Sequence, residues 1–142
     1  MYVGGGATVT ATQREFMENS GDGVYCRGAN TKARLNDCKM HHNGEDGLWS
    51  MSDAVVDLQG TSTDIHSNKR YGILAWSAKV NIRLPSQQHN TSHGNVEEDR
   101  VQWEGGSIAN INTDGTFTHA VVDDDDDDGD YYTTNTMEER MC

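Results

Sequence analysis

The chain has 142 residues, a formal net charge of −12 at neutral pH and a hydrophobic content of 34%, and this length suits a single domain. No apolar run approaches the roughly 20 residues of a membrane span, and the first residues have neither the basic nor the apolar region of a secretory signal. We therefore expect no membrane span and no signal peptide, and the compartment stays unassigned. The acidic balance leaves no basic footprint, so nucleic acid is excluded as a partner.

A recurring pair of residues divides the first hundred positions into coils. An asparagine is followed four residues later by a glycine in four places, with 24, 25 and 22 residues from one asparagine to the next: Asn19 with Gly23, Asn43 with Gly47, Asn68 with Gly72, and Asn90 with Gly94. A period of this length is typical of stacked solenoid coils. Asparagine tolerates tight turns and forms hydrogen-bonded ladders, so we expect these residues to join successive coils at one corner.

Apolar residues recur at fixed offsets from each asparagine, as expected of a coil that buries one face. Positions ten and eight residues before it have the two-residue spacing of an inward-facing strand. Positions three before and five after it predict two further strands. The four columns are Val9, Ala33, Leu58 and Val80; Ala11, Leu35, Gly60 and Ile82; Phe16, Met40, Ile65 and Gln87; and Val24, Leu48, Ile73 and Asn95.

Three short strands per coil, joined by turns rich in Asn, Gly, Asp and Ser, resemble the right-handed parallel β-helix of the pectin-lyase-like superfamily. The resemblance covers about residues 1–100. It implies an all-β solenoid of about four coils. The same fold is found in proteins without catalysis, so activity has to be inferred from particular residues.

We expect a β-helix domain over residues 1–119 and an acidic disordered tail over 120–142. Regular coils are expected to about residue 94, and residues 95–119 are predicted to form a cap or a degenerate fifth coil, with Trp103 as a lid on the core. The tail contains six consecutive aspartates and is interpreted as a solvated segment. At the other end, Tyr2 and Val3 align with Cys26 and Arg27 in mid-coil, which predicts a fragment of a longer protein or an end covered by a partner.

The strand that follows each glycine is predicted to present a row of apolar and aromatic side chains to the outside. If Val24, Leu48 and Ile73 point inward, their neighbours point outward, and successive coils lie about 4.8 Å apart. The outward residues are Tyr25, Trp49 and Leu74 in one ladder and Arg27, Met51 and Trp76 in the next. The resemblance implies that this wall binds a polysaccharide, and a protein surface is the alternative partner.

Acidic residues beside this wall are candidates for glycoside hydrolysis or for metal binding. Asp22 and Asp46 precede their glycines, and stacking one coil apart would place their carboxylates about 5 Å from each other, as in a retaining glycosidase. Together with Glu45 they would offer oxygen ligands to Ca²⁺, and no other cofactor is expected. Two turn aspartates in registered coils show the same spacing without any function.

Other patterns are weaker. Asn112-Thr113-Asp114 is similar to the Asn-Thr-Asp motif of polygalacturonases, but the other elements of that family are not found in suitable order. His41 and His66 share a column, and two imidazoles fall short of the three or four ligands of a metal site. Three cysteines that the register separates predict no disulfide framework.

The sequence therefore favours a β-helix binding module that contacts a carbohydrate polymer along its aromatic wall, and it favours binding over catalysis. Two alternatives stay open. One is a polysaccharide hydrolase or lyase that uses Asp22 and Asp46, and the other is a protein-interaction scaffold repeat within a larger protein.

Overall fold

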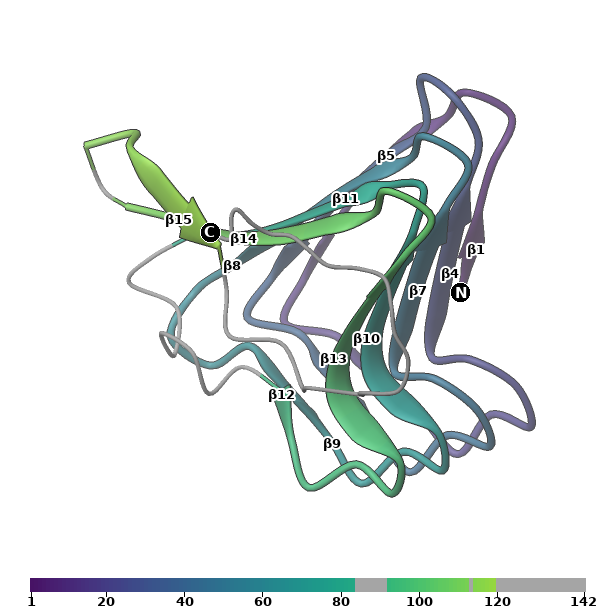
Figure 1. Cartoon of the computed structure of the whole chain (residues 1–142). Helices are drawn as coiled ribbons and strands as arrows, with labels where there is room; N and C mark the ends of the chain where they lie inside the picture. Colours follow the sequence, from purple (N-terminus) through teal and green to yellow (C-terminus); the bar gives the residue numbers. More distant parts are fainter. Residues whose placement is uncertain (84–91, 113, 120–142) are drawn as a thin grey trace.

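The computed structural model describes residues 1–83, 92–112 and 114–119, and this part of the chain is all-β (Figure 1). It contains no helix that is long and apolar enough to cross a membrane. The strands in chain order are β1 Tyr2–Val3, β2 Thr8–Thr12, β3 Glu15–Met17, β4 Val24–Arg27, β5 Lys32–Asn36, β6 Lys39–His41, β7 Leu48–Met51, β8 Val55–Gln59, β9 Asp64–His66, β10 Tyr71–Trp76, β11 Lys79–Arg83, β12 Ser92–His93, β13 Glu98–Trp103, β14 Ser107–Ile111 and β15 Phe117–His119.

Each full coil contributes one strand to each of three sheets. Sheet A has the order β1-β4-β7-β10-β13, sheet B the order β15-β14-β11-β8-β5-β2, and sheet C the order β12-β9-β6-β3. Neighbouring strands are parallel except for β14 and β15, which form an antiparallel pair at one end of sheet B (Figure 1). Because every described strand except β15 pairs in parallel with its equivalent one coil away, the chain forms a parallel β-helix, as predicted.

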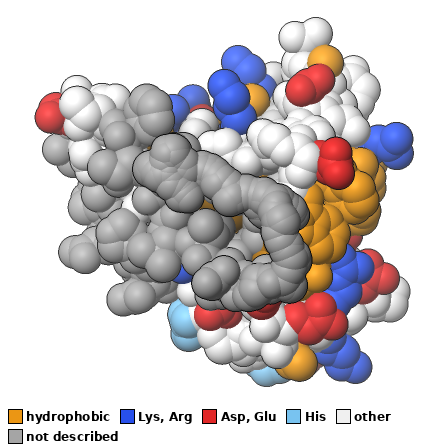
Figure 2. Space-filling view, viewed as in Figure 1, with side chains coloured by type: hydrophobic (Ala, Val, Ile, Leu, Met, Phe, Trp, Pro, Cys, Tyr) orange, Lys and Arg blue, Asp and Glu red, His pale blue; other side chains and the backbone are white. Residues whose placement is uncertain are grey.

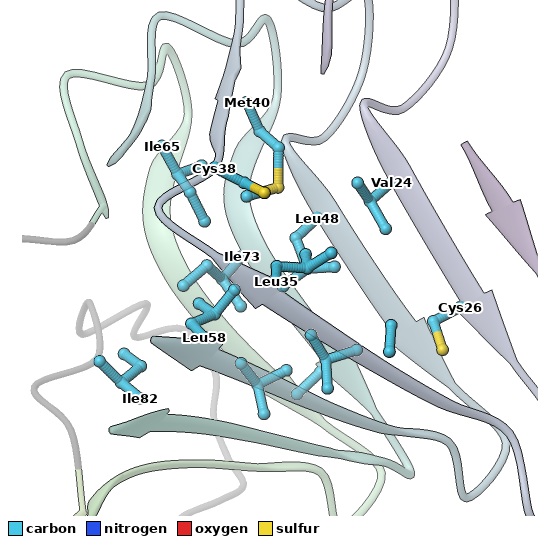
Figure 3. Close-up of a cluster of buried hydrophobic side chains, with 14 of the residues drawn as sticks. Val24, Cys26, Leu35, Cys38, Met40, Leu48, Leu58, Ile65, Ile73 and Ile82 are labelled. Atoms are coloured by element: carbon cyan, nitrogen blue, oxygen red, sulfur yellow. The ribbon is translucent and has the colours of Figure 1, made fainter. Parts of the chain in front are cut away.

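The core is a narrow apolar column between the three sheets (Figure 3). Val24, Leu48 and Ile73 lie in register on β4, β7 and β10 and are fully buried, as predicted. Such a thin column needs few side chains per coil, which explains how a chain of low hydrophobic content forms it. Cys26 and Cys38 are free thiols within this column.

The predicted asparagine ladder is present at the corner between sheets C and A. The backbone N–H and the Nδ2 of Asn43 both donate to Oδ1 of Asn68, at 3.1 and 2.9 Å. Asn19 donates in the same way to Asn43, and Asn68 to Asn95. Asn43 and Asn68 are fully buried, so these bonds satisfy polar groups that water does not reach.

The glycine of each repeat makes room for the asparagine of the next coil. A Cβ on Gly47 would lie 2.7 Å from Nδ2 of Asn68 and 2.5 Å from the side chain of Ile65. A Cβ on Gly23 would lie 2.8 Å from Nδ2 of Asn43. The four-residue spacing of the motif therefore has a steric cause, because only glycine permits this close approach.

The fourth member of the ladder is Asn95, and the prediction that Asn90 and Gly94 form the fourth repeat is wrong. Asn68 and Asn95 are 27 residues apart, and no atom lies within 4 Å of the position that a Cβ on Gly94 would take. The backbone N–H and the Nδ2 of Asn95 both donate to Oδ1 of Asp99, at 2.9 and 2.8 Å. Asp99 thus takes the place that a fifth asparagine would have in the ladder. Asn90 and Gln87 lie outside the described residues.

The third coil also differs from the predicted register. Val56 pairs with Ala33 and Val80, and Leu58 pairs with Leu35 and Ile82. Leu58 therefore belongs to the second inward column of its strand, with Leu35 and Ile82, and not to the first column as predicted. Gly60 is not an inward residue. It lies in a turn with φ 93°, and the longer turn between β8 and β9 accounts for the two-residue shift.

The first strand is shifted by one position from its prediction. Tyr2 pairs with Tyr25, and Val3 pairs with Cys26. Val3 is therefore buried, and Tyr2, at 65% exposure, points outward. A one-residue change in register exchanges the two faces of a strand, so the aromatic ring joins the outer wall instead of the core.

Parallel pairing continues past residue 94 into a fifth coil. β13 pairs with β10 along its length, and β14 pairs with β11. The inward column of Val24, Leu48 and Ile73 continues with Arg100, which is buried. A charged residue at this core position explains why the apolar pattern of the sequence stops here. Residues 120–142, predicted to be a tail, lie outside the described residues.

Candidate ligand-binding surface

The outer face of sheet A brings five aromatic side chains together, one from each coil. Tyr2, Tyr25 and Trp49 occupy one outward column of β1, β4 and β7, and Trp76 and Trp103 occupy the next outward column of β10 and β13. We call these five residues the aromatic strip. It runs obliquely across the wall, because the aromatic position moves by two residues between the third and fourth coils.

Neighbouring rings of the aromatic strip are in contact from one end to the other. The ring centroids of Tyr2 and Tyr25 are 5.4 Å apart, those of Tyr25 and Trp49 4.7 Å, those of Trp49 and Trp76 6.3 Å, and those of Trp76 and Trp103 5.3 Å. Tyr25, Trp49, Trp76 and Trp103 are all half-buried. Each ring of the strip thus packs against the rings before and after it and keeps part of its surface exposed to solvent.

The rings differ in orientation along the strip. Tyr25 and Trp49 are stacked with an angle of 23° between their planes, and Trp49 and Trp76 make an angle of 30°. Trp103 is turned by 83° from Trp76 and by 82° from Tyr71. The faces of Tyr25 and Trp49 are therefore partly covered by each other. At the other end of the strip, Trp103 is nearly perpendicular to its neighbour.

The other predicted contact residues have different environments. Leu74 pairs with Trp49 and Val101 in the outward column but is fully buried, so it does not have the exposed surface predicted for it. Met51 is half-buried, and its Sδ accepts a hydrogen bond from Oη of Tyr25 at 3.2 Å. Arg27 is exposed at the end of β4.

Figure 2 shows the resulting surface as a continuous apolar area on the side where sheet A lies, bordered by acidic and basic side chains. One of the flanking cations is Arg70. Its guanidinium lies 5.0 Å from the ring centroid of Tyr71 and 3.9 Å from a carboxylate oxygen of Glu45. The wall thus combines a hydrophobic centre with a polar rim, as binding surfaces do.

A pocket of about 510 Å³ lies at the corner between sheets A and B, next to the last two rungs of the strip. Ser77 and Glu104 directly follow Trp76 and Trp103, and the Ser77 hydroxyl donates to the backbone oxygen of Glu104 at 2.6 Å. The pocket opens to solvent, and Asp53, Lys79 and Glu104 are exposed. Its lining residues are Asp53, Val55, Ser77, Ala78, Lys79, Glu104 and Gly105.

Asp22 and Asp46 stack in successive coils as predicted, and each carboxylate binds the backbone of the following coil. Oδ1 of Asp22 accepts from the N–H of Asp46 at 2.9 Å, and Oδ1 of Asp46 accepts from the N–H of Tyr71 at 3.1 Å. Burial raises the pKa of both carboxyls, that of Asp46 to about 7 against the opposing effects of the Tyr71 N–H and Arg70. Asp46 is fully buried, so its present role is to fix the turn.

Asp22, Glu45 and Asp46, the three carboxylates considered as Ca²⁺ ligands, all interact with other groups of the protein. Within residues 1–83, 92–112 and 114–119, no group of three or more His, Cys, Asp or Glu side chains is placed to hold a metal ion. The two aspartates point at backbone N–H groups, and Glu45 lies beside Arg70. Glu45 and Asp46 share Arg70, and both aspartates are tied to backbone N–H groups, so the three carboxylates are not free to converge on a Ca²⁺ ion.

The predicted histidine column is present on sheet C and is longer than expected. The rings of His41 and His66 stack at 4.9 Å with parallel planes, and His93 continues the stack at 5.4 Å. Carboxylates anchor both ends, since Nε2 of His41 lies 2.9 Å from Glu15 and Nε2 of His93 lies 2.7 Å from Asp64. These contacts describe a structural ladder on a different wall from the aromatic strip.

Asp114, which resembles a catalytic aspartate in sequence, lies in the turn between β14 and β15. It is exposed, and its Oδ1 accepts hydrogen bonds from the N–H and the hydroxyl of Thr116 at 3.0 and 2.7 Å. The hydroxyl bond is the main cause of a lowered pKa of Asp114. The carboxylate of Asp114 thus stabilises its own turn.

Trp103 and Tyr2 are the strip residues that the sequence reasoning missed. The prediction of Trp103 as a lid on the core is wrong, because it is in register with Trp76 on the outer face. The signal was available in the repeat Leu74-Ala75-Trp76 and Val101-Gln102-Trp103. The pocket had no signal in sequence, since its lining comes from turns of three coils.

Comparisons with known proteins agree with this architecture. No curated protein and no solved structure matches the chain. A family model described as the right handed beta helix region matches residues 1–137. On that match and on the parallel coils described above, the chain belongs to the right-handed β-helix family.

Proposed function

We propose that this protein is a binding module that holds a carbohydrate polymer along the aromatic strip. The observation that supports this proposal is the unbroken row of Tyr2, Tyr25, Trp49, Trp76 and Trp103 on an outer wall, each ring within 6.3 Å of the next. A row with one ring per coil repeats about every 4.8 Å. A polymer of similar short repeat can contact several rungs at once.

The chemistry of the strip suits sugars. A sugar ring has an apolar CH face and a polar rim of hydroxyl groups, and tyrosine and tryptophan combine apolar rings with polar N–H and O–H groups. Burial of apolar surface contributes about 25 cal/mol per Å², so several modest contacts along one polymer add up. The Oη of Tyr25 donates to the Sδ of Met51, and a thioether sulfur is a weak acceptor. A sugar hydroxyl would offer Tyr25 a stronger acceptor in its place.

The carboxylates support binding over hydrolysis. Retaining hydrolysis needs two carboxyl groups that both face the substrate. Asp46 is fully buried and bonded to the N–H of Tyr71, and Asp22 is bonded to the N–H of Asp46. Both groups would have to leave the backbone before they reached a glycosidic bond.

The test is affinity electrophoresis of the full chain in gels that contain a polysaccharide. A Trp49→Ala/Trp76→Ala double variant is expected to lose retardation while its circular dichroism spectrum stays β-rich. Met17→Ala is the matched control, because Met17 is 43% exposed on β3 of a different sheet. Retardation that persists unchanged in the double variant contradicts the proposal, and retention of the folded protein by a protein partner through the same tryptophans would favour the scaffold alternative.

A further inference from the structure

We propose that the sugar ring is held at the Trp103 end of the aromatic strip and that the ligand is an uncharged glycan, with its hydroxyl groups received by the corner pocket. This inference rests on the proposed function and specifies its site and its ligand class. It assigns to Trp103, Asp53 and Glu104 a role in recognition.

Ring orientation distinguishes Trp103 from the inner rings of the aromatic strip. A sugar stacks on the open face of an aromatic ring, and the faces of Tyr25 and Trp49 are turned toward one another at 4.7 Å and 23°. Trp103 is the last ring of the strip and stands at 83° to Trp76. Its plane is thus turned out of the stack of Tyr25 and Trp49, although Trp76 and Tyr71 both contact it at nearly right angles.

The corner pocket begins at the turn that directly follows Trp103. Glu104 and Gly105 directly follow Trp103, and both line the pocket of about 510 Å³. Ser77 lines the same pocket and is tied to this turn, because its N–H donates to the backbone oxygen of Trp103 at 3.0 Å. An aromatic platform and a pocket with polar side chains therefore share one turn, the combination that orients a small ring.

The charged side chains at the pocket are mainly acidic. Asp53 and Glu104 are exposed carboxylates at the pocket, and Lys79 is the one basic residue among the described residues that line it. Carboxylates accept strong hydrogen bonds from hydroxyl groups, and they repel the carboxylates or sulfates of an acidic polysaccharide. The net charge of −12 acts in the same direction.

The cations of the wall do not reverse this preference. Arg27 is three coils from Trp103 in the register of β4, β7, β10 and β13, which is about 14 Å at 4.8 Å per coil. That separation exceeds the Debye length of about 8 Å at physiological salt. Arg70 lies 3.9 Å from a carboxylate oxygen of Glu45, so its charge has a partner even when Asp46 is protonated.

The experiment uses gels cast with hydroxyethylcellulose or galactomannan, which are uncharged, and with polygalacturonate, which is acidic. We expect the full chain to be retarded by at least one neutral gel at both low and high salt, and to run freely in polygalacturonate at physiological salt. Trp103→Ala is expected to weaken neutral binding roughly tenfold, equivalent to about 1.4 kcal/mol, and Trp103→Phe to retain most of it.

The charge variant tests the pocket without removing the ring. Asp53→Asn/Glu104→Gln is expected to weaken neutral binding several-fold and to permit binding to polygalacturonate. Glu18→Gln/Glu97→Gln is the matched control, because it changes the net charge equally at exposed positions outside the pocket. It is expected to behave as the wild type in both kinds of gel.

The variants give different results depending on whether the inference or the proposed function fails. If the Trp49→Ala/Trp76→Ala variant loses binding but Trp103→Ala and the pocket variant do not, the inference is overturned and the proposed function stands. Equal or stronger retardation of the wild type by polygalacturonate also overturns the inference alone. If no gel retards the wild type, both the inference and the proposed function are overturned.

Discussion

Asn43 gives both its backbone N–H and its side-chain N–H to one oxygen of Asn68, and Asn68 repeats the arrangement toward Asn95. Each asparagine in the middle of the ladder is therefore a donor to one coil and an acceptor from another. The side-chain Nδ2 also donates to a backbone oxygen, that of Phe16 for Asn43 and that of Met40 for Asn68. The corner is held by polar groups that are satisfied only when the coils are in register.

Replacement of Asn68 by alanine is expected to be strongly destabilising. The change removes the acceptor of two buried N–H groups of Asn43, one on the backbone and one on the side chain, at a cost of about 1–3 kcal/mol each. Urea unfolding followed by circular dichroism measures the loss. Asn19→Ala is the matched control, since Asn19 is exposed at the first rung, and its loss is expected to be below about 1.5 kcal/mol. Equal losses in the two variants would contradict the ladder as a source of stability.

Replacement of Gly47 by alanine tests the steric origin of the repeat. The new Cβ would lie 2.5 Å from the Ile65 side chain and 2.9 Å from the backbone oxygen of Gly72, and overpacking of this kind costs about 1–3 kcal/mol or more. Gly21→Ala is the control, because no atom lies within 4 Å of that Cβ position. A thermal unfolding midpoint that falls in Gly21→Ala as far as in Gly47→Ala would count against the explanation.

The sequence predicted the three-strand coil because Val24, Leu48 and Ile73 recur with the asparagine at constant offsets. It failed where a turn changed length. The turn at Gly60 shifted the third coil by two residues, and the 27 residues between Asn68 and Asn95 moved the fourth rung from Asn90 to Asn95. Both failures have the same physical cause, because a solenoid fixes its strands and its corner residues but tolerates insertions in its turns.

The candidate site was predictable in part for the same reason. Tyr25, Trp49 and Trp76 lie on strands whose register followed from the repeat, so their outward position was correct. Trp103 was missed because Arg100 occupies an inward position and hides the continuation of the apolar column. Ring orientation and the corner pocket depend on contacts between coils, and no periodicity in a sequence contains that information.

The buried carboxyl of Asp46 predicts a loss of stability as pH rises. Burial raises its pKa from 3.8 to about 7, so between these values the unfolded chain has released the proton and the folded chain has kept it. The free energy of unfolding then falls with increasing pH and becomes level above about 7. The total effect is a few kcal/mol, at about 1.4 kcal/mol for each tenfold change in proton affinity.

Asp46→Asn isolates this effect, because an amide oxygen still accepts the N–H of Tyr71 and has no proton to lose. Urea unfolding at pH 5 and at pH 8 is expected to show the wild type losing stability relative to Asp46→Asn over this interval. The opposite trend would mean that the contact between Asp46 and Arg70, 3.4 Å at its closest, outweighs the cost of burial.

The histidine column predicts a second pH dependence, of opposite sign. Burial is the main cause that lowers the pKa of His66 below 6.5, and His41, His93 and His42 act in the same direction while Asp64 opposes them. As pH falls below 6.5, the unfolded chain takes up a proton that the folded chain resists, so the free energy of unfolding decreases. His66→Gln removes the titrating group, and urea unfolding is expected to show a smaller loss of stability between pH 7 and pH 5 in this variant than in the wild type.

His42→Gln is the control, because His42 is exposed and its ring meets the ring of His66 edge-on. If His42→Gln changed the pH dependence of stability as much as His66→Gln does, the stacked position of His66 would not be the cause.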